Sequence, residues 1–293
     1  MTDLLQGVYL PIVTPFYEEQ VDFDSYSLLL RHYLEKGISG LIPLGTTGEA
    51  PTIEEEEFFK IVEATLETVA SRIPIFVGIS SNSTRKALHV IQGLAKYPLQ
   101  GYLVTSPYYN LPSQQGIYEH FRKLADSTDR KIIMYNIPSR TGRNIENETI
   151  FRLSKVPNMA GIKDSCGNIA QTIELLRERD PGFSVLTGED ILFYFNIVGG
   201  GSGGILAAAH LQTERFMRIY DLVQKNEHRQ ALQEWNCISK VIPLLFKEPN
   251  PAPVKYVLSR KGLIRSEEVR LPLAPISEGL KRVFDKLIDE GTI

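Results

Sequence analysis

Short apolar runs alternate with longer amphipathic ones along the first 225 residues, and this rhythm constrains the fold more than any other feature. Eight runs of four to six residues are rich in Val, Ile, Leu and Tyr and are bounded by Gly, Pro or polar residues. Such runs are typical of buried strands. They are Tyr9–Val13, Gly40–Leu44, Ile73–Gly78, Gly101–Val104, Lys131–Tyr135, Met159–Lys163, Ser184–Thr187 and Gly203–Leu206.

Helical patterns lie between the predicted strands. Apolar residues recur at helical spacing from Tyr26 to Leu34, and Gly37 stands where that helix would end. Thr52-Ile-Glu-Glu55 has the form of a capping box that opens the next helix. The same apolar spacing returns at Ile169, Ile173 and Leu176. Strand and helix therefore alternate along the chain.

Eight strand–helix units fit in residues 8–225, and repeated βα units favour a parallel sheet covered by helices. Eight units that close on themselves predict an α/β protein of the (β/α)₈ TIM-barrel class. The alternative is a doubly wound open sheet. That fold would need a phosphate-type glycine fingerprint after the first strand, and Leu10-Pro-Ile-Val-Thr-Pro15 is not one.

The rhythm changes after residue 225, so we expect a catalytic barrel over 1–225 and a helical appendage over 226–293. Residues 226–246 have a helical pattern, and a proline-rich turn follows. Further helices are predicted around Pro253–Arg260 and Ser277–Asp289. Such an appendage packs on the barrel or builds an oligomer contact, and the pattern does not separate the two.

Composition excludes several classes of function. Hydrophobic residues make up 43% of the chain and the formal charge is −3, which excludes disorder and disfavours nucleic-acid binding. No apolar run approaches bilayer length, and no secretory signal is visible. Only Cys166 and Cys237 are present, which fits a reducing cytoplasm. The five histidines are scattered, so no metal site is expected.

In a (β/α)₈ barrel the active site lies at the carboxyl ends of the strands, and Lys163 ends the sixth predicted strand. A lysine that loses hydration there can supply a neutral amine, which forms Schiff bases with ketones. The alternative is a lysine that reaches solvent. Tyr135 ends the adjacent strand, so its phenol could approach the lysine and move protons; the alternative is a packing tyrosine.

Two further strand ends suit anionic groups. The turn Gly45-Thr-Thr-Gly48 offers hydroxyls and backbone N–H groups to a carboxylate, or is an ordinary βα turn. Arg140 follows the fifth strand in a tight loop and could bind a second carboxylate, or form a surface salt bridge. Together with Lys163 and Tyr135, these features describe a Schiff-base enzyme for a 2-oxo acid and a second anionic substrate.

The ordered motifs resemble the dihydrodipicolinate synthase / N-acetylneuraminate lyase family, from Gly7 to about Phe284. This family contains pyruvate-dependent class I aldolases built on a (β/α)₈ barrel. The motifs are Gly45-Thr-Thr-Gly-Glu49, Ser106-Pro-Tyr-Tyr-Asn110, Tyr135-Asn-Ile-Pro-Ser-Arg-Thr-Gly142 and Gly161-Ile-Lys-Asp164. Arg140 and the segment Glu248–Lys255 favour the synthase branch.

The resemblance implies a mechanism. Lys163 attacks the ketone of pyruvate, whose carboxylate is held by Thr46 and Thr47. Tyr135 relays protons through Thr47 to Tyr109, which comes from a neighbouring subunit.

The resemblance also implies the second substrate and the assembly. Arg140 binds the carboxylate of aspartate semialdehyde, and Gly188 and Ile205 line the pyruvate pocket. No cofactor is implied, because the lysine itself is the electron sink. The resemblance further implies a homotetramer built as a dimer of dimers.

The sequence departs from the family in two places. Asp164-Ser165-Cys166 stands where synthases more often have Glu-Ala-Thr, and an Asp there occurs in sugar-acid aldolases, which keeps that activity as the alternative. In relatives inhibited by lysine, Asn82 and Tyr108 match the inhibitor cleft, but Lys86 replaces an acidic residue. Since a cation then faces the ligand's amine, we expect weak or absent lysine inhibition.

Overall fold

The computed structural model describes residues 4–293, and the chain divides into two compact units. Unit 1 contains the described residues up to Gly7 together with Pro74–Ile205. Unit 2 contains Val8–Ile73 and Leu206–Ile293. This division cuts across the barrel and appendage expected from the sequence, and the boundary at 225/226 stays a prediction.

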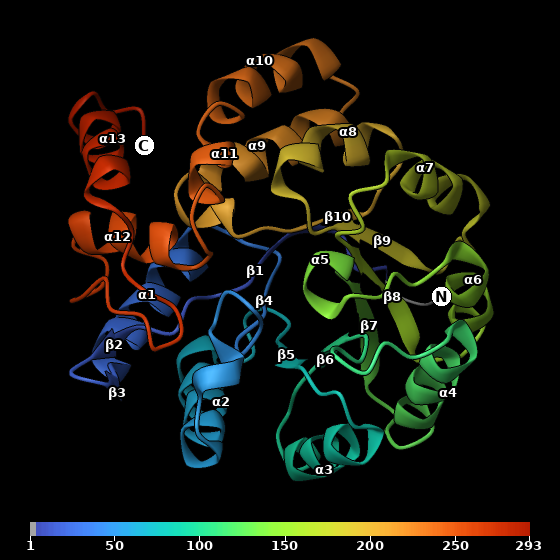
Figure 1. The fold of residues 1–293 in the computed structure, drawn as a ribbon. Coiled ribbons are helices and arrows are strands. Elements are labelled where there is room, and N and C mark those ends of the chain that lie inside the picture. The colour runs from blue at the N-terminus through green and yellow to red at the C-terminus, as the bar shows by residue number, and fades with distance from the viewer. Residues whose placement is uncertain (1–3) are drawn as a thin grey trace. The chain divides into compact units, whose positions relative to one another are not determined.

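Unit 1 is built on parallel strands that follow the order β10-β9-β8-β7-β6-β5. The strands are β5 (Phe76–Ile79), β6 (Gly101–Thr105), β7 (Lys131–Asn136), β8 (Met159–Asp164), β9 (Ser184–Thr187) and β10 (Gly203–Ile205). The connecting helices are α3 (Thr84–Leu94), α4 (Gln114–Ala125), α5 (Pro138–Thr141), α6 (Asn147–Ser154), α7 (Ile169–Glu178), η2 (Asp190–Leu192) and α8 (Phe193–Val198). Figure 1 shows α4, α6 and α7 in succession along one side of these strands.

Unit 2 joins the start of the chain to its end. Its strands are β1 (Gly7–Leu10) parallel to β4 (Gly40–Leu41), and the small antiparallel pair β2 (Phe16–Tyr17) and β3 (Gln20–Val21). Its helices are α1 (Phe23–Glu35), η1 (Ala50–Thr52), α2 (Glu55–Val69), η3 (Ala208–His210), α9 (Thr213–Gln224), α10 (His228–Ile238), α11 (Ile242–Leu245), α12 (Ala252–Arg260) and α13 (Glu278–Asp289).

The strand order over the chain is β4-β1-β10-β9-β8-β7-β6-β5, with a helix between most successive strands. This is the eightfold parallel βα succession of a (β/α)₈ barrel with helices after it, which confirms the predicted fold class. All eight predicted strands are present, with ends shifted by up to three residues. The strands are buried on both faces, which explains why their sequences are continuous apolar runs and not alternating ones.

The structure corrects two local predictions and adds one element that was not predicted. The N-cap of α2 is Glu54, which forms its capping box with Glu57, so Thr52 belongs to η1 instead. Arg140 lies in the one-turn helix α5, and not in a loop, because Pro138 begins the turn and Gly142 ends it at φ 73°. The β2–β3 hairpin was missed, since two-residue strands leave too little alternation to detect.

The helices predicted after residue 225 are confirmed, and no strand occurs among the described residues beyond β10. Ser277 caps α13 by accepting a hydrogen bond from the N–H of Leu280, as its position in the sequence suggests. None of the helices in residues 4–293 combines the length and apolarity that crossing a bilayer requires.

Candidate active site

Lys163 and Tyr135 meet inside unit 1. They are register partners on the neighbouring strands β8 and β7, so both side chains point to the same face of the sheet. The Lys163 Nζ lies 4.2 Å from the centroid of the Tyr135 ring. Lys163 is 6% exposed and Tyr135 is 5% exposed, which rules out a lysine that simply reaches solvent. A buried amine beside a phenol is a suitable pair for carbonyl chemistry.

Gly188 leaves the space that the lysine side chain occupies. A Cβ built on Gly188 would lie 2.6 Å from the Lys163 Cε and 2.2 Å from the Ser165 Oγ. Any side chain at this position would displace the amine. The backbone N–H of Gly188 also donates to the Asp164 carbonyl at 2.7 Å, which joins the ends of β8 and β9.

Ser165 is a polar residue near the lysine whose importance sequence reasoning missed. Its side chain is 4% exposed, and its Oγ has no hydrogen-bond partner among the described residues. Residues i and i+2 of a strand share a face, so Ser165 follows Lys163 onto the same side. That alternation was the available signal. A buried hydroxyl without a partner beside an amine is available to a bound ligand.

Asp164 is held on the opposite face of β8. Its carboxylate accepts hydrogen bonds from the Thr172 hydroxyl at 2.6 Å and from the Cys166 N–H at 3.2 Å. Burial and the neighbouring Asp164 raise the pKa of the Cys166 thiol to about 11, so this thiol is not a nucleophile near neutral pH. Burial likewise raises the pKa of Glu189.

A cavity of about 720 Å³ lies beside Asp164 and Glu189 in unit 1. Helices α7 and α8 supply its apolar wall through Ile169, Ile173 and Phe195, all more than half exposed. The predicted apolar face of α7 is therefore present, but it is directed outward.

The other predicted residues of unit 1 lie at a strand end, in the one-turn helix α5 or in a loop. Ile205 ends β10 and is 1% exposed. Arg140 is exposed and forms no ion pair with a described residue of its unit, so it is not the surface salt bridge considered above. Tyr109 is 88% exposed and has a left-handed backbone with φ 72°.

Thr46 and Thr47 belong to unit 2, in a tightly bonded turn after β4. The N–H groups of Gly48 and Ala50 donate to the Gly45 carbonyl, and the Thr14 hydroxyl donates to the Gly48 carbonyl at 2.8 Å. Among the described residues of unit 2, no group accepts a hydrogen bond from the backbone N–H of Thr46 or from that of Thr47. Free N–H groups and hydroxyls in one turn are suited to a carboxylate.

Glu49 fixes the end of this turn through a buried ion pair. Its carboxylate lies 2.5 Å from the Lys255 Nζ, and both side chains are fully buried. Burial lowers the pKa of Lys255 to about 8 and raises that of Glu49, while each charge supports the other. The Lys255 ammonium also donates to the Glu268 carbonyl and lies 4.0 Å from the centroid of the Phe16 ring.

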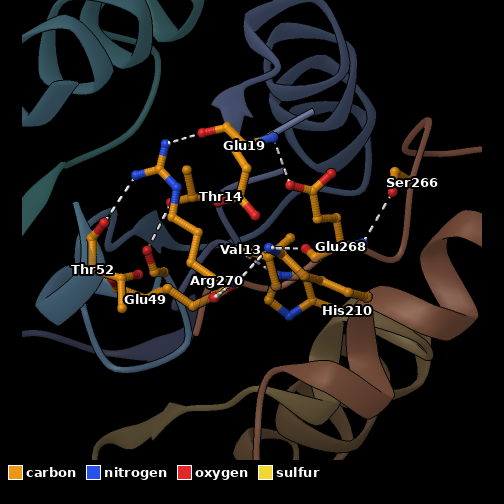
Figure 2. A network of polar contacts seen from close by, with 11 residues as sticks. Val13, Thr14, Glu19, Glu49, Thr52, His210, Ser266, Glu268 and Arg270 are labelled. Atoms are coloured by element: carbon orange, nitrogen blue, oxygen red, sulfur yellow. Dashed lines mark hydrogen bonds and ion pairs between the residues drawn. The ribbon is translucent and has the colours of Figure 1, made fainter. Parts of the chain in front are cut away.

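Arg270 ties the same turn to three other segments (Figure 2). Its backbone N–H donates to Glu49 at 3.1 Å, and its guanidinium donates to the carbonyls of Thr52 and Glu19. The guanidinium also makes two 2.6 Å hydrogen bonds to the Glu57 carboxylate. We call Glu49, Lys255 and Arg270 the anchor network. The segments that carry Lys255 and Arg270 therefore pack on the turn after β4.

Asn250 extends this anchoring to Thr47. Its Nδ2 donates to the Thr47 Oγ1 at 3.0 Å, across 203 positions of sequence. Neither Asn250 nor the anchor network was predicted, because nothing local in the sequence links residue 250 to residue 47. No group of three or more His, Cys, Asp or Glu side chains within residues 4–293 is arranged to hold a metal ion.

Comparison with known proteins places this geometry in a family. The family model described as Dihydrodipicolinate synthetase family matches residues 4–290. The chain is 50% identical over 284 residues to 4-hydroxy-tetrahydrodipicolinate synthase 2 of Clostridium acetobutylicum, covering 97% of this chain and 99% of that one.

Solved structures of dihydrodipicolinate synthases support the same family assignment. Dihydrodipicolinate synthase from Thermotoga maritima superposes with a TM-score of 0.95 at 34% identity, covering 99% of this chain and all of the other. A structure described as the first monomeric dihydrodipicolinate synthase variant gives the same TM-score and identity, covering 99% of this chain and 98% of the other. On its motifs, fold and full-length similarity, the chain belongs to the dihydrodipicolinate synthetase family.

Proposed function

We propose that this chain is a 4-hydroxy-tetrahydrodipicolinate synthase, a lyase of lysine and diaminopimelate biosynthesis that condenses pyruvate with L-aspartate 4-semialdehyde. The observation that carries the proposal is the buried Lys163 amine beside the Tyr135 ring, with Gly188 leaving it room. The full-length similarity to proteins of that name supports the substrate pair.

The proposed reaction begins at the lysine. The Lys163 amine attacks the ketone of pyruvate, water leaves, and loss of a methyl proton gives an enamine. Thr46 and Thr47 hold the pyruvate carboxylate with the unpaired N–H groups and hydroxyls of their turn. Gly188 and Ile205 line the pyruvate pocket.

Proton transfer and the second substrate complete the cycle. Tyr135 relays protons through Thr47 to Tyr109. The enamine carbon attacks the aldehyde, while the Arg140 guanidinium binds the carboxylate of the aspartate semialdehyde. The substrate's own amine then displaces Lys163 and releases the cyclic product. No metal or organic cofactor enters this scheme, because the iminium supplies the electron sink.

We further propose a homotetramer, a dimer of dimers, located in the cytoplasm. A tyrosine that is 88% exposed in a left-handed backbone contributes little to its own subunit, which supports a role for Tyr109 in a neighbour's site. The outward apolar face of α7 and α8 supports a second contact between copies. Both cysteines are free, as a reducing compartment requires.

Subunit complementation tests the sharing of Tyr109. Homomers of Tyr109→Phe and of Lys163→Ala should each have little activity. Mixed oligomers should regain activity, because a subunit with an intact lysine then receives an intact tyrosine from its neighbour. Failure of the mixed species to exceed either parent, with mixing verified by native mass spectrometry, would refute sharing.

The nearest rival is a pyruvate aldolase for a 2-keto-3-deoxy sugar acid or for 4-hydroxy-2-oxoglutarate, which Asp164 brings into consideration. A coupled assay separates the two: pyruvate and aspartate semialdehyde are supplied, and NADPH consumption by added dihydrodipicolinate reductase is followed. Turnover that falls sharply in Arg140→Ala supports the synthase. No turnover, with Lys163 still trapped by pyruvate and borohydride, favours the rival.

A further inference from the structure

The hydroxyl of Thr47 is held by a residue from the far end of the chain. Asn250 precedes α12 and donates its side-chain N–H to the Thr47 Oγ1 at 3.0 Å. The Thr47 side chain is 4% exposed and Asn250 is 8% exposed, so water does not compete freely for this bond. A threonine hydroxyl has one hydrogen to donate and two lone pairs to accept with. Asn250 occupies one lone pair and leaves the hydrogen free for another acceptor.

The two chain segments that carry Asn250 and Thr47 are also held together by a second contact. Five residues further on, Lys255 enters the buried ion pair with Glu49, two residues beyond Thr47. The main chain on either side of the hydrogen bond is therefore pinned at a second point. This makes the approach of residue 250 to residue 47 a property of the folded unit and not of two mobile side chains.

The other end of the Asn250 amide is open. Its Oδ1 is buried and has no hydrogen-bond partner among the described residues. An unpaired buried acceptor costs stability, and this oxygen stays available to a further hydrogen-bond donor.

We propose that Asn250 is a positioning residue that sets the direction of the Thr47 hydroxyl and strengthens it as a proton donor. A hydroxyl that accepts a hydrogen bond donates a better one, because each bond polarises the next. The inference rests on the proposed function, in which Thr47 passes protons from Tyr135 to Tyr109. It brings the C-terminal helical region into the catalytic machinery.

A double-mutant cycle tests the proposal on a step that needs no aldehyde. Enamine formation exchanges the methyl protons of pyruvate for deuterium from heavy water, and NMR follows the exchange. We expect Asn250→Ala to slow exchange about 10-fold and Thr47→Val to slow it about 100-fold. The double variant should match Thr47→Val within about twofold, since Asn250 acts only through that hydroxyl.

Asn250→Asp supplies a readout that a purely structural role would not move. An ionised carboxylate accepts the Thr47 hydrogen and draws it away, so exchange at neutral pH should be slower than in Asn250→Ala. As the pH falls and the carboxyl becomes protonated, it can donate again and the rate should recover relative to Asn250→Ala. Parallel pH profiles for the two variants would contradict the proposal.

Asn147→Ala is the matched control. Asn147 is 7% exposed, donates through its Nδ2 to Glu174, and has an unpartnered Oδ1 like that of Asn250. The Asn147→Ala protein should be less stable than the wild type, but it should exchange the methyl protons of pyruvate for deuterium at the wild-type rate.

The outcomes separate the two levels of inference. Equal fold-losses from Asn250→Ala in the wild-type and Thr47→Val backgrounds would overturn the positioning role while leaving the Schiff-base chemistry intact. A wild-type protein that exchanges no deuterium would overturn the proposed function, and the positioning role would fall with it.

Discussion

The two units differ in how the polar groups of their proposed site residues are bonded. Beside the lysine in unit 1, Ser165 keeps a buried hydroxyl without a partner among the described residues, and elsewhere in this unit Tyr109 is almost fully exposed. Around the threonine turn in unit 2, the anchor network and His210 connect charged and polar groups into a bonded set (Figure 2). The comparison indicates that unit 1 keeps a buried hydroxyl available beside the lysine, whereas the threonine turn of unit 2 is fixed by internal bonds, with the Asn250 Oδ1 as an unpaired acceptor beside it.

The difference has a physical reason. An unpaired buried group costs stability, so it persists where a ligand completes it. A carboxylate-binding turn gains from being fixed before the ligand arrives, because ordering it on binding would cost affinity. The proposed chemistry needs both an unpaired group that a ligand can complete and a carboxylate-binding turn that is fixed in advance.

The largest effect expected in unit 1 is the loss of Lys163. Lys163→Ala should lower turnover about 10⁴-fold or more, because no other side chain forms the Schiff base. Mass spectrometry after borohydride reduction with pyruvate should then show no adduct. The exposed Lys123→Ala is the control and should be trapped as the wild type is. Trapping in Lys163→Ala would place the nucleophile elsewhere.

The largest stability effect should come from the anchor network. Lys255→Met leaves the Glu49 carboxylate buried without its cation, which costs about 3–5 kcal/mol of unfolding free energy. Urea denaturation measures this. Adding Glu49→Gln should recover part of the loss, because the stranded charge is removed. A Lys255→Met protein as stable as the wild type would contradict the comparison between the units.

His210 should make unit 2 sensitive to acid. Its Nδ1 donates to the Ala207 carbonyl and its Nε2 accepts from the Val13 N–H, so only the neutral ring fits. Burial lowers the pKa of His210 to about 4, whereas the unfolded chain binds the proton near 6.5.

The unfolded state therefore binds more protons between these values, and stability is lost as pH falls from about 6.5 to about 4. The total contribution is about 3 kcal/mol. In urea titrations, His210→Gln should be less stable than the wild type at pH 7.5, and that gap should narrow by pH 5. A gap independent of pH would exclude the linkage. Burial also lowers the pKa of His120 to about 4. His120 is present in both the wild type and His210→Gln, so it does not contribute to the difference between them.

The smallest effect should be feedback by lysine. Lys86 is exposed in the first turn of α3, and we expect its positive charge to repel the amine of lysine in the cleft that the family resemblance implies. Millimolar lysine should change the initial rate by less than about twofold. Lys86→Glu should increase the sensitivity, with Arg85→Glu as the neighbouring control. Strong inhibition of the wild type would show that this position does not decide the response.

Within unit 1 the sequence correctly brought two of the candidate site residues together. Lys163 and Tyr135 could be placed together because each ends a strand, and adjacent parallel strands bring their carboxyl ends to the same edge. Ser165 was missed although strand alternation pointed to it. The outward direction of the α7 apolar face was hidden, since helical spacing reveals that a face exists and not what covers it.

Local pattern determined the strands, most of the helices and the residues at the strand ends, because hydrophobic periodicity and capping act over a few residues. Only the tertiary structure decided that Asn250 reaches Thr47, that Lys255 pairs with Glu49 and that Arg270 joins three segments. These contacts span some two hundred positions, and nothing in a local pattern selects one distant partner over another. Packing of the folded chain makes that selection, because burial away from water leaves each charged or polar group only a few neighbours that can satisfy it.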